Sequence, residues 1–256
     1  MKSYLKEMMF RWWYWYVSLV DKKAEIQLMN YGYHDPEDHV HLDQHHESNR
    51  YSIQLYHHFT KHVPLDQKDI VEIGSGRGGG ISYLTETFKP KSAIGIDLEM
   101  KAVDFSKSHH QHPNLTFLQG DAQKLNLDNE SVDVVLNVES SHRYPDNKSF
   151  LSEVHRILRP NGHFLYTDFH YDYEIEKFKQ ELAQCGMKIL HEKNINNQVI
   201  EALNQDDQRR RDLVKKLTPF FLHKVALNFS GAIDSETYRK IKNQEYVYFS
   251  YILEKK

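Results

Sequence analysis

From residue 69 onward, the hydrophobic and polar positions of the chain predict strands and helices in turn. Short apolar runs of strand length lie between segments whose apolar residues recur every three or four positions, which is the spacing of one helix face. The predicted strands are residues 69–73, 92–97, 115–119, 132–138 and 163–169. The predicted helices between them are residues 78–88, 101–109 and 149–158. This β–α–β succession predicts a parallel sheet with right-handed crossover connections.

Beyond residue 170 the spacing changes. The pattern predicts a helix over residues 173–185, a short strand over 187–193, a polar helix over 195–216 and a final strand over 246–253. The charged segment 206–211 is interpreted as a solvated helix face.

Composition excludes several classes of protein. The chain has 256 residues and a formal net charge of −3, so bulk electrostatics give no reason to expect a nucleic-acid partner. A single cysteine, Cys185, rules out an intrachain disulfide and fits the reducing cytoplasm, where we expect the protein to be. The length suffices for one domain with additions.

All three tryptophans, Trp12, Trp13 and Trp15, lie in one aromatic segment near the N-terminus. This segment is too short for a membrane span and is interrupted by Arg11, and it lacks the features of a signal peptide. Trp and Tyr favour boundaries between apolar and polar surroundings. Two interpretations therefore stay open, namely a helix that contacts a membrane surface or an apolar substrate, and a helix that packs on the protein's own core.

The first predicted strand runs directly into a glycine-rich turn, residues 74–80. Clustered glycines expose bare backbone and adopt positive φ angles at little cost. In open α/β sheets, ligands bind at the carboxyl ends of the strands, so this turn marks the expected cofactor site, with Gly74, Ser75, Gly76 and Gly78 as its contacts. The spacing Gly74-x-Gly76-x-x-Gly79 also fits the dinucleotide-binding fingerprint, so the neighbouring residues must decide between ligands.

Acidic residues at successive strand ends favour S-adenosylmethionine over a dinucleotide. Glu72 precedes the glycines, and a carboxylate there can help to hold an ammonium or a loop but would repel a pyrophosphate. Asp97, followed by Leu98, can accept hydrogen bonds from both ribose hydroxyls, as it also could in a dinucleotide enzyme. Asp121, followed by Ala122, can accept from an adenine amino group. We therefore expect S-adenosylmethionine as cofactor and S-adenosylhomocysteine as its product.

These residues resemble the class I S-adenosylmethionine-dependent methyltransferases. Residues 72–80 are similar to the first motif of that family, and residues 158–162 to its turn before the fifth strand. Residues 47–51, 55–57 and 135–145 are similar to a bacterial subgroup typified by the phthiotriol/phenolphthiotriol dimycocerosate methyltransferases, which O-methylate long-chain lipids. The likeness runs over nearly the whole chain.

The resemblance implies an α/β, Rossmann-like fold with a doubly wound, mostly parallel seven-stranded sheet and an antiparallel last strand. It implies an N-terminal aromatic helix and lid segments over residues 1–60, and a methyltransferase core over 61–256 with a helical insertion at about 195–243. In the family such N-terminal segments fold over the cofactor, which makes Tyr33 a candidate contact.

Methyl transfer to a hydroxyl benefits from a base, and His142 is the leading candidate. It lies just beyond the fourth predicted strand, and a histidine titrates near neutral pH. Asp168 ends the fifth strand, so it can orient His142 or act as a second base, and the resemblance implies a His and an Asp at these two places. The residues that follow the fourth strand should border the methionine end of the cofactor: Asn137, Val138 and Glu139.

A histidine-rich segment, with His39, His41, His45 and His46, invites a metal interpretation, but its ligand spacing is not clear, and we expect no native metal. The expected function is methyl transfer to a hydroxyl of a small-molecule, polyketide-like or lipid acceptor. N- or C-methyl transfer on the same fold, a dinucleotide-dependent oxidoreductase and a non-enzymatic membrane-surface protein remain alternatives. The sequence assigns no oligomeric state.

Overall fold

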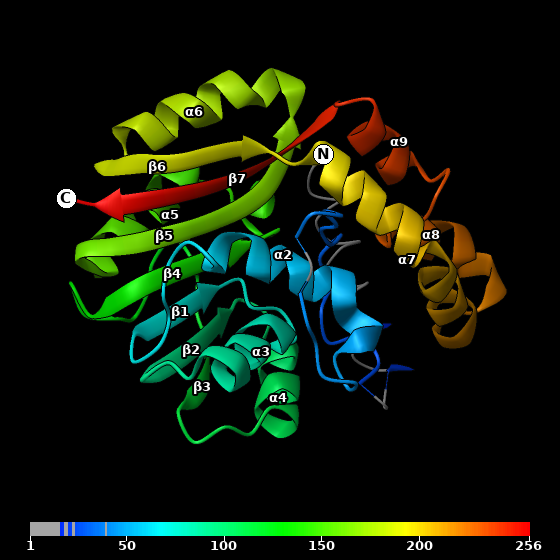
Figure 1. Ribbon diagram of the computed structural model, residues 1–256, viewed down its shortest axis with the longest axis horizontal. Helices are drawn as coiled ribbons and strands as arrows, with labels where there is room; N and C mark the ends of the chain where they lie inside the picture. The colour runs from blue at the N-terminus through cyan, green and yellow to red at the C-terminus, as the bar shows by residue number, and fades with distance from the viewer. Residues whose placement is uncertain (1–15, 18–19, 22–23, 39) are drawn as a thin grey trace.

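A computed structural model describes residues 16–17, 20–21, 24–38 and 40–256. Its centre is a seven-stranded sheet in the order β3-β2-β1-β4-β5-β7-β6 (Figure 1). Strand β7 is antiparallel to both its neighbours, and all the other pairs are parallel. The expected fold class is therefore confirmed. The strands are β1 (Asp69–Ile73), β2 (Ser92–Asp97), β3 (Leu115–Gln119), β4 (Val132–Val138), β5 (Leu158–Tyr171), β6 (Met187–Asn194) and β7 (Tyr246–Lys255).

Helices cover both faces of the sheet. One buried cluster joins α2, α3, α4, α7 and α9 to one face, and a second joins α5 and α6 to the other. Neighbouring strand residues such as Val134 and Val135 point to opposite clusters, which explains the uninterrupted apolar run of β4. The helices are α2 (Arg50–Thr60), α3 (Gly79–Phe88), α4 (Met100–His109), α5 (Asn147–Ile157), α6 (Ile175–Gln184), α7 (Asn196–Leu217), α8 (His223–Phe229) and α9 (Glu236–Lys242).

Helices α7, α8 and α9 pack together beside the sheet, at the end away from the C-terminus (Figure 1). They occupy residues 196–242, between β6 and β7. No helix in the described part of the chain is long and apolar enough to cross a membrane. Trp12, Trp13 and Trp15 lie outside the described residues.

The prediction that residues 206–211 form a solvated face is wrong at two positions. Asp206 and Arg210 are only 5% and 8% exposed, and they form an ion pair at 2.9 Å. Arg210 also donates hydrogen bonds to the carbonyl oxygens of Ser230, at 2.8 Å, and Tyr31, at 3.0 Å. These charges are buried because they hold the N-terminal segment and the residues after α8 against α7.

Candidate functional site

The glycine turn between β1 and α3 presents backbone to open space at one position. Gly74, Gly76 and Gly78 have φ angles of +75°, +53° and +77°. A Cβ added at Gly74 would lie 1.9 Å from Ser140 Oγ, and one at Gly78 would lie 2.6 Å from the Phe117 ring. A Cβ at Gly76 would meet no atom within 4 Å. Packing therefore requires glycine at 74 and 78, whereas the backbone of Gly76 faces the space that a ligand can enter.

Glu72 lies beneath this turn and anchors two helices. It is 1% exposed and accepts hydrogen bonds from the Tyr56 hydroxyl of α2, at 2.6 Å, and from the backbone N–H of Ile81 in α3, at 3.0 Å. Burial raises the pKa of Glu72 to about 7, against the lowering effect of these two hydrogen bonds. Its carboxylate therefore links α2 to α3, the helix that follows the turn.

Asp97 adjoins the turn from the end of β2. One of its carboxylate oxygens accepts from the N–H of Gly76 at 2.8 Å, and the other from the N–H of Glu99 at 2.9 Å. Burial raises the pKa of Asp97, partly offset by these hydrogen bonds. The next side chain, Leu98, is 60% exposed, an unusual exposure for leucine that leaves an apolar surface beside the turn.

Asp121 and Ala122 follow the end of β3. Asp121 is exposed and accepts from the backbone N–H of Gln123 at 2.9 Å, while Ala122 is buried. The N–H of Gly120 donates to the Asp97 carbonyl at 3.0 Å, which joins the two strand ends. The ends of β1, β2 and β3 thus bring the glycine turn, Asp97 and Asp121 to one edge of the sheet in that order.

Two buried polar atoms beside the turn have no hydrogen-bond partner among the described residues, Ser75 Oγ and Asn137 Oδ1. The amide nitrogen of Asn137 donates to the Ile73 carbonyl at 2.8 Å, which fixes the side chain at the end of β1. The next residue of β4, Val138, is buried. Unsatisfied buried groups are costly, so these two atoms fit a polar ligand such as the amino-acid end of S-adenosylmethionine.

Glu139 follows β4 with a strained backbone, because its φ angle is +47° and it is not glycine. Its carboxylate accepts from the backbone N–H of Tyr31 at 2.7 Å. Burial raises the pKa of Glu139 to about 8. The N-terminal segment is thereby attached to this edge of the sheet through Tyr31.

The structure does not bring Tyr33 to the same place. Tyr33 is 2% exposed, stacks on His58 at 4.3 Å between ring centroids, and donates to Asp35 at 3.1 Å. The contact with the site comes instead from the main chain of Tyr31. A backbone N–H can donate from nearly any type of residue, so the side chain at position 31 did not indicate this contact.

His142, in the turn after β4, meets Asp168, which lies within β5 just after its last residue paired with β4; β5 continues to Tyr171, so Asp168 does not end the strand as expected. The distance between His142 Nδ1 and Asp168 Oδ1 is 2.7 Å, and the backbone N–H of His142 donates to Asp168 Oδ2 at 3.0 Å. The His142 side chain keeps 19% of its surface exposed, whereas Asp168 is fully buried. Although burial raises the pKa of Asp168, the charge and hydrogen bonds of His142 outweigh it and bring that pKa to about 2.

A second set of buried groups holds Asp168, and the sequence did not single it out. Ser141 Oγ donates to Asp168 Oδ2 at 2.8 Å and also lies 2.8 Å from the Tyr166 hydroxyl. That hydroxyl in turn lies 2.8 Å from His170 Nε2. These residues fix the carboxylate of Asp168 by contacts between β5 and the turn after β4.

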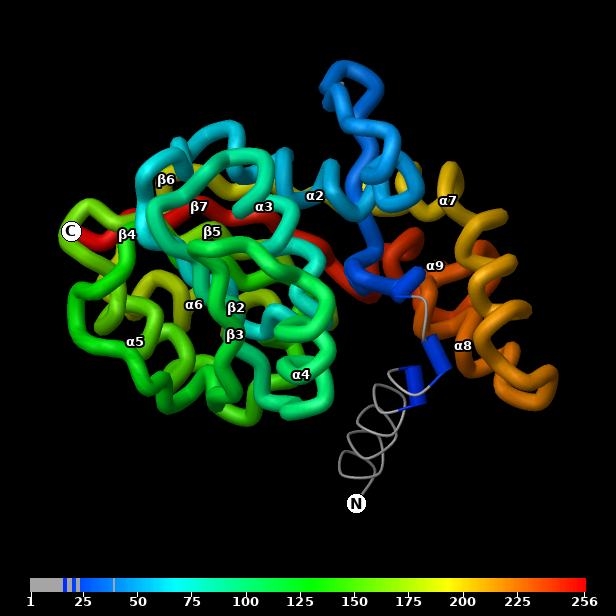
Figure 2. Tube along the Cα trace, turned by 90° about the horizontal axis from the view of Figure 1, so that it is seen from below, coloured from blue at the N-terminus to red at the C-terminus, as the bar shows by residue number. Residues whose placement is uncertain are grey.

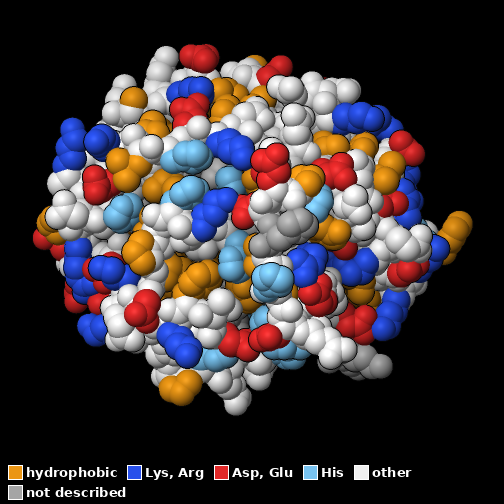
Figure 3. Space-filling view, viewed as in Figure 1, with side chains coloured by type: hydrophobic (Ala, Val, Ile, Leu, Met, Phe, Trp, Pro, Cys, Tyr) orange, Lys and Arg blue, Asp and Glu red, His pale blue; other side chains and the backbone are white. Residues whose placement is uncertain are grey.

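Histidines are conspicuous on the face shown in Figure 3. Among the described residues, one group has metal-ligand spacing: His45, His46 and Glu86, with ligand atoms within 4.8 Å of one another. His39 lies outside the described residues. The expectation of no native metal stays a prediction.

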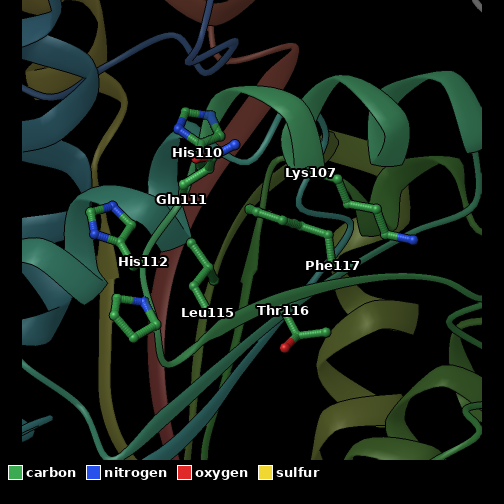
Figure 4. Close-up of a pocket in the computed structure, with 8 residues that line it drawn as sticks. Lys107, His110, Gln111, His112, Leu115, Thr116 and Phe117 are labelled. Carbon is green, nitrogen blue, oxygen red and sulfur yellow. The ribbon is translucent and has the colours of Figure 1, made fainter.

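A shallow hollow of about 440 Å³ lies behind the glycine turn, lined by residues between Lys107 and Phe117 (Figure 4). His110 Nε2 lies 2.9 Å from the Arg77 carbonyl oxygen, and the Phe117 ring packs under Gly78. None of the predicted site residues lines this hollow. His110 and Phe117, which line the hollow, therefore contact the glycine turn.

Comparisons with known proteins agree with this arrangement. Residues 71–166 match the methyltransferase domain family. The chain is 38% identical over 247 residues to the phthiotriol/phenolphthiotriol dimycocerosates methyltransferase of Mycobacterium tuberculosis, covering 95% of this chain and 92% of that protein. It is 40% identical over 202 residues to the fatty-acid O-methyltransferase of Mycolicibacterium smegmatis, covering 78% and 74% of the two chains.

Solved structures share the fold. The geranyl diphosphate C-methyltransferase of Streptomyces coelicolor, in complex with Mg²⁺, geranyl diphosphate and S-adenosylhomocysteine, superposes with a TM-score of 0.68 at 13% identity, over 93% of this chain and 95% of that one. These findings do not favour the dinucleotide-dependent oxidoreductase. The chain belongs to the S-adenosylmethionine-dependent methyltransferases, in the group that includes the phthiotriol/phenolphthiotriol dimycocerosates methyltransferases.

Proposed function

We propose that this methyltransferase methylates an oxygen of a lipid or polyketide-like acceptor, with His142 as general base and Asp168 as the residue that orients it. The observation that carries the proposal is the 2.7 Å contact between His142 Nδ1, in the turn after β4, and Asp168 Oδ1, in the neighbouring strand β5. A base held in place by a buried carboxylate suits a hydroxyl, which must lose a proton. An amine acceptor, whose lone pair is already free, would gain less from it.

We propose that the cofactor binds at the edge of the sheet formed by the carboxyl ends of β1, β2 and β3. Bound there, S-adenosylmethionine supplies an activated methyl group. Glycine backbone and the orphaned Ser75 and Asn137 atoms would hold its amino-acid end, and Asp97 and Asp121 its ribose and adenine. Glu72, Val138 and Glu139 would shape the edge, Glu72 and Glu139 by fixing the helices and the N-terminal segment around it. The residues that we propose to contact the cofactor or to shape its site are Glu72, Gly74, Ser75, Gly76, Gly78, Asp97, Leu98, Asp121, Ala122, Asn137, Val138 and Glu139.

The protonation of the pair follows from the charge of Asp168. Hydrogen bonds from Ser141 Oγ and from the backbone N–H of His142 hold Asp168 as a carboxylate that can only accept, so the ring nitrogen that faces it, Nδ1 of His142, carries a proton. The lone pair is then on Nε2, which takes the proton of the acceptor hydroxyl as the oxygen accepts the methyl group. The imidazolium so formed lies against a buried anion, and a positioned base of this kind contributes roughly 10²–10⁴-fold in rate.

The surroundings of His142 suit an apolar acceptor. Its ring lies 4.3 Å from that of Phe169, between centroids, and Phe169 lies 4.8 Å from Tyr246 and 5.9 Å from Tyr31. The relatives named for phthiotriol and for fatty acids make a long-chain acceptor the first choice. We also propose that the enzyme works in the cytoplasm and contacts membranes peripherally.

The test is transfer of labelled methyl groups to hydroxylated long-chain lipids by wild-type enzyme and by His142→Ala. We expect kcat to fall by about 10²–10⁴-fold while the affinity for S-adenosylhomocysteine is unchanged. His41→Ala, which removes an exposed histidine from the N-terminal segment, is the matched control and should retain full activity. If His142→Ala keeps most of its kcat, His142 is not the base, and amines and carbon nucleophiles become the acceptors to test.

A further inference from the structure

Two phenylalanines stand almost free of the protein in the turn between α7 and α8. Phe220 is 87% exposed and Phe221 is 79% exposed, the highest values for large hydrophobic side chains in the described part of the chain. They occupy the short 3-10 turn η4 (Phe220–Leu222), which begins after Pro219. We refer to residues 215–224 as the α7–α8 tip. Apolar side chains exposed together at this level mark an interaction site more often than scattered single ones do.

The base of the α7–α8 tip is well fixed, so the exposure belongs to the fold. Thr218 donates its hydroxyl to the Val214 carbonyl at 2.6 Å, and His223 Nε2 lies 3.0 Å from the Thr218 carbonyl. Val214 packs with Val17 and Ala226 in a small buried cluster. The tip therefore holds both phenylalanine rings outward on a rigid support.

The first residues that the structure describes pack against the same end of α7. The Tyr16 hydroxyl donates to the Leu217 carbonyl at 3.0 Å, which joins the N-terminal segment to the end of α7. Figure 2 shows α8 and α7 at the end of the molecule opposite to the C-terminus.

The α7–α8 tip that carries the two rings also contains three lysines. Lys215, Lys216 and Lys224 are exposed, and residues 213–233 contain no aspartate or glutamate, although the whole chain has a net charge of −3. Lys215 lies 3.9 Å from Asp212 and Lys216 lies 2.5 Å from Glu25. Exposed pairs of this kind are weak, so the lysines can still attract an anionic surface.

We infer that the α7–α8 tip docks on the surface of a bilayer that contains anionic lipids. The phenylalanine rings enter the boundary between head groups and acyl chains, and the lysines lie at the level of the phosphates. A second copy of the chain fits less well, because two side chains bury far less than a stable dimer needs and the facing lysines repel. The inference stands apart from the chemistry of His142, and it adds a way to reach an acceptor held in a membrane.

The experiment measures binding of the full chain to vesicles of phosphatidylcholine alone and of phosphatidylcholine mixed with phosphatidylglycerol. We expect binding to the mixed vesicles that weakens as salt is raised. Phe220→Ser combined with Phe221→Ser should lower the partition coefficient by at least about tenfold. Lys215→Gln, Lys216→Gln and Lys224→Gln together should lower it by about 100-fold, roughly fivefold for each lysine.

Matched controls carry the same changes elsewhere. Ile189→Ser with Leu190→Ser removes two exposed apolar side chains from β6. Lys107→Gln, Lys177→Gln and Lys188→Gln together make the same change in net charge on α4, α6 and β6. Both controls should bind vesicles as the wild type does. All variants should keep the wild-type melting temperature and affinity for S-adenosylhomocysteine, which excludes misfolding as the cause.

Three results would overturn the inference: equal binding to neutral and anionic vesicles, unchanged binding after the phenylalanine substitutions, or a dimer in size exclusion that those substitutions dissociate. The last would assign the tip to a second copy of the chain. Methyl transfer to a detergent-dispersed acceptor should be unaffected by changes in the tip. Failure of vesicle binding and failure of the proposed function are therefore separate results.

Discussion

Gly76→Ala should weaken cofactor binding while leaving the protein folded. The backbone of Gly76 has a φ angle of +53°, and a Cβ there meets no atom of the protein within 4 Å. The added methyl group therefore clashes with nothing in the free enzyme. It occupies the open space in which we place the cofactor, so its cost should appear on binding.

Two magnitudes follow from this geometry. A non-glycine residue in the left-handed region costs roughly 1–2 kcal/mol, and for a chain of this size each 1 kcal/mol lowers the melting temperature by about 2–4 °C. We expect the free variant to melt about 2–8 °C below the wild type. Forcing an extra methyl group into a filled contact costs roughly 1–3 kcal/mol, which corresponds to an affinity about 5- to 150-fold weaker.

Gly186→Ala is the matched control. Gly186 follows α6 and has a φ angle of +81°. A Cβ added there would lie 3.1 Å from Nε2 of His155, a residue of α5. Both residues are far from the glycine turn in the sequence. The control variant carries a similar backbone strain without approaching the proposed cofactor. Calorimetric titration with S-adenosylhomocysteine and thermal melting of both variants separate the two effects. Wild-type affinity in Gly76→Ala would refute the assignment of this backbone to the cofactor, and equal losses in both variants would attribute the effect to general destabilisation.

Two further predictions concern buried charge. Glu72 has a pKa of about 7 in the folded protein, so between about pH 4.5 and 7 it loses its proton in the unfolded chain but keeps it in the folded one. The free energy of unfolding of the wild type therefore falls by roughly 3 kcal/mol as pH rises through this window. In urea unfolding, Glu72→Gln should flatten this part of the plot of unfolding free energy against pH, and an unchanged slope would contradict the assignment. Asp21→Asn should cost roughly 3–5 kcal/mol by leaving the buried Arg77 guanidinium, 3.0 Å away, without a counter-charge. Thermal melts should show partial recovery in the double variant with Arg77→Met.

The succession of strands along the chain, and the residues at which they end, could be predicted from the sequence because hydrophobic pattern and turn residues indicate the same bounds. Strands β1 to β4 have the expected bounds, since each apolar run is bounded by glycine, proline or polar residues. Strand β5 was expected to begin at residue 163 but begins at Leu158. Its pairing with β4 shifts register between Val132 and Val134, so the residues expected to form a turn, 159–162, lie within an irregular strand.

Within the candidate site, the pairs that strand order brings together were predictable, and those that depend on folded-back segments were not. Asp168 lies in β5 directly after Thr167, the last residue paired with β4, so its contact with His142 follows from the topology. The partner of Glu72 is the hydroxyl of Tyr56, a residue of α2, and nothing local indicates that this helix crosses the glycine turn. The burial of Arg210 likewise depends on the Tyr31 carbonyl, 179 positions away.

Strand β7 lies between β5 and β6 and forms the only sheet contact of β6 in the described residues. During synthesis, β6 leaves the ribosome about 60 residues before β7 is complete, a wait of roughly 3–12 s at ordinary elongation rates. In that interval the edge of β5 is unpaired and β6 has no place in the sheet. The nascent chain therefore exposes the edges of β5 and β6 at once, and a chaperone that binds extended segments has this interval in which to bind them.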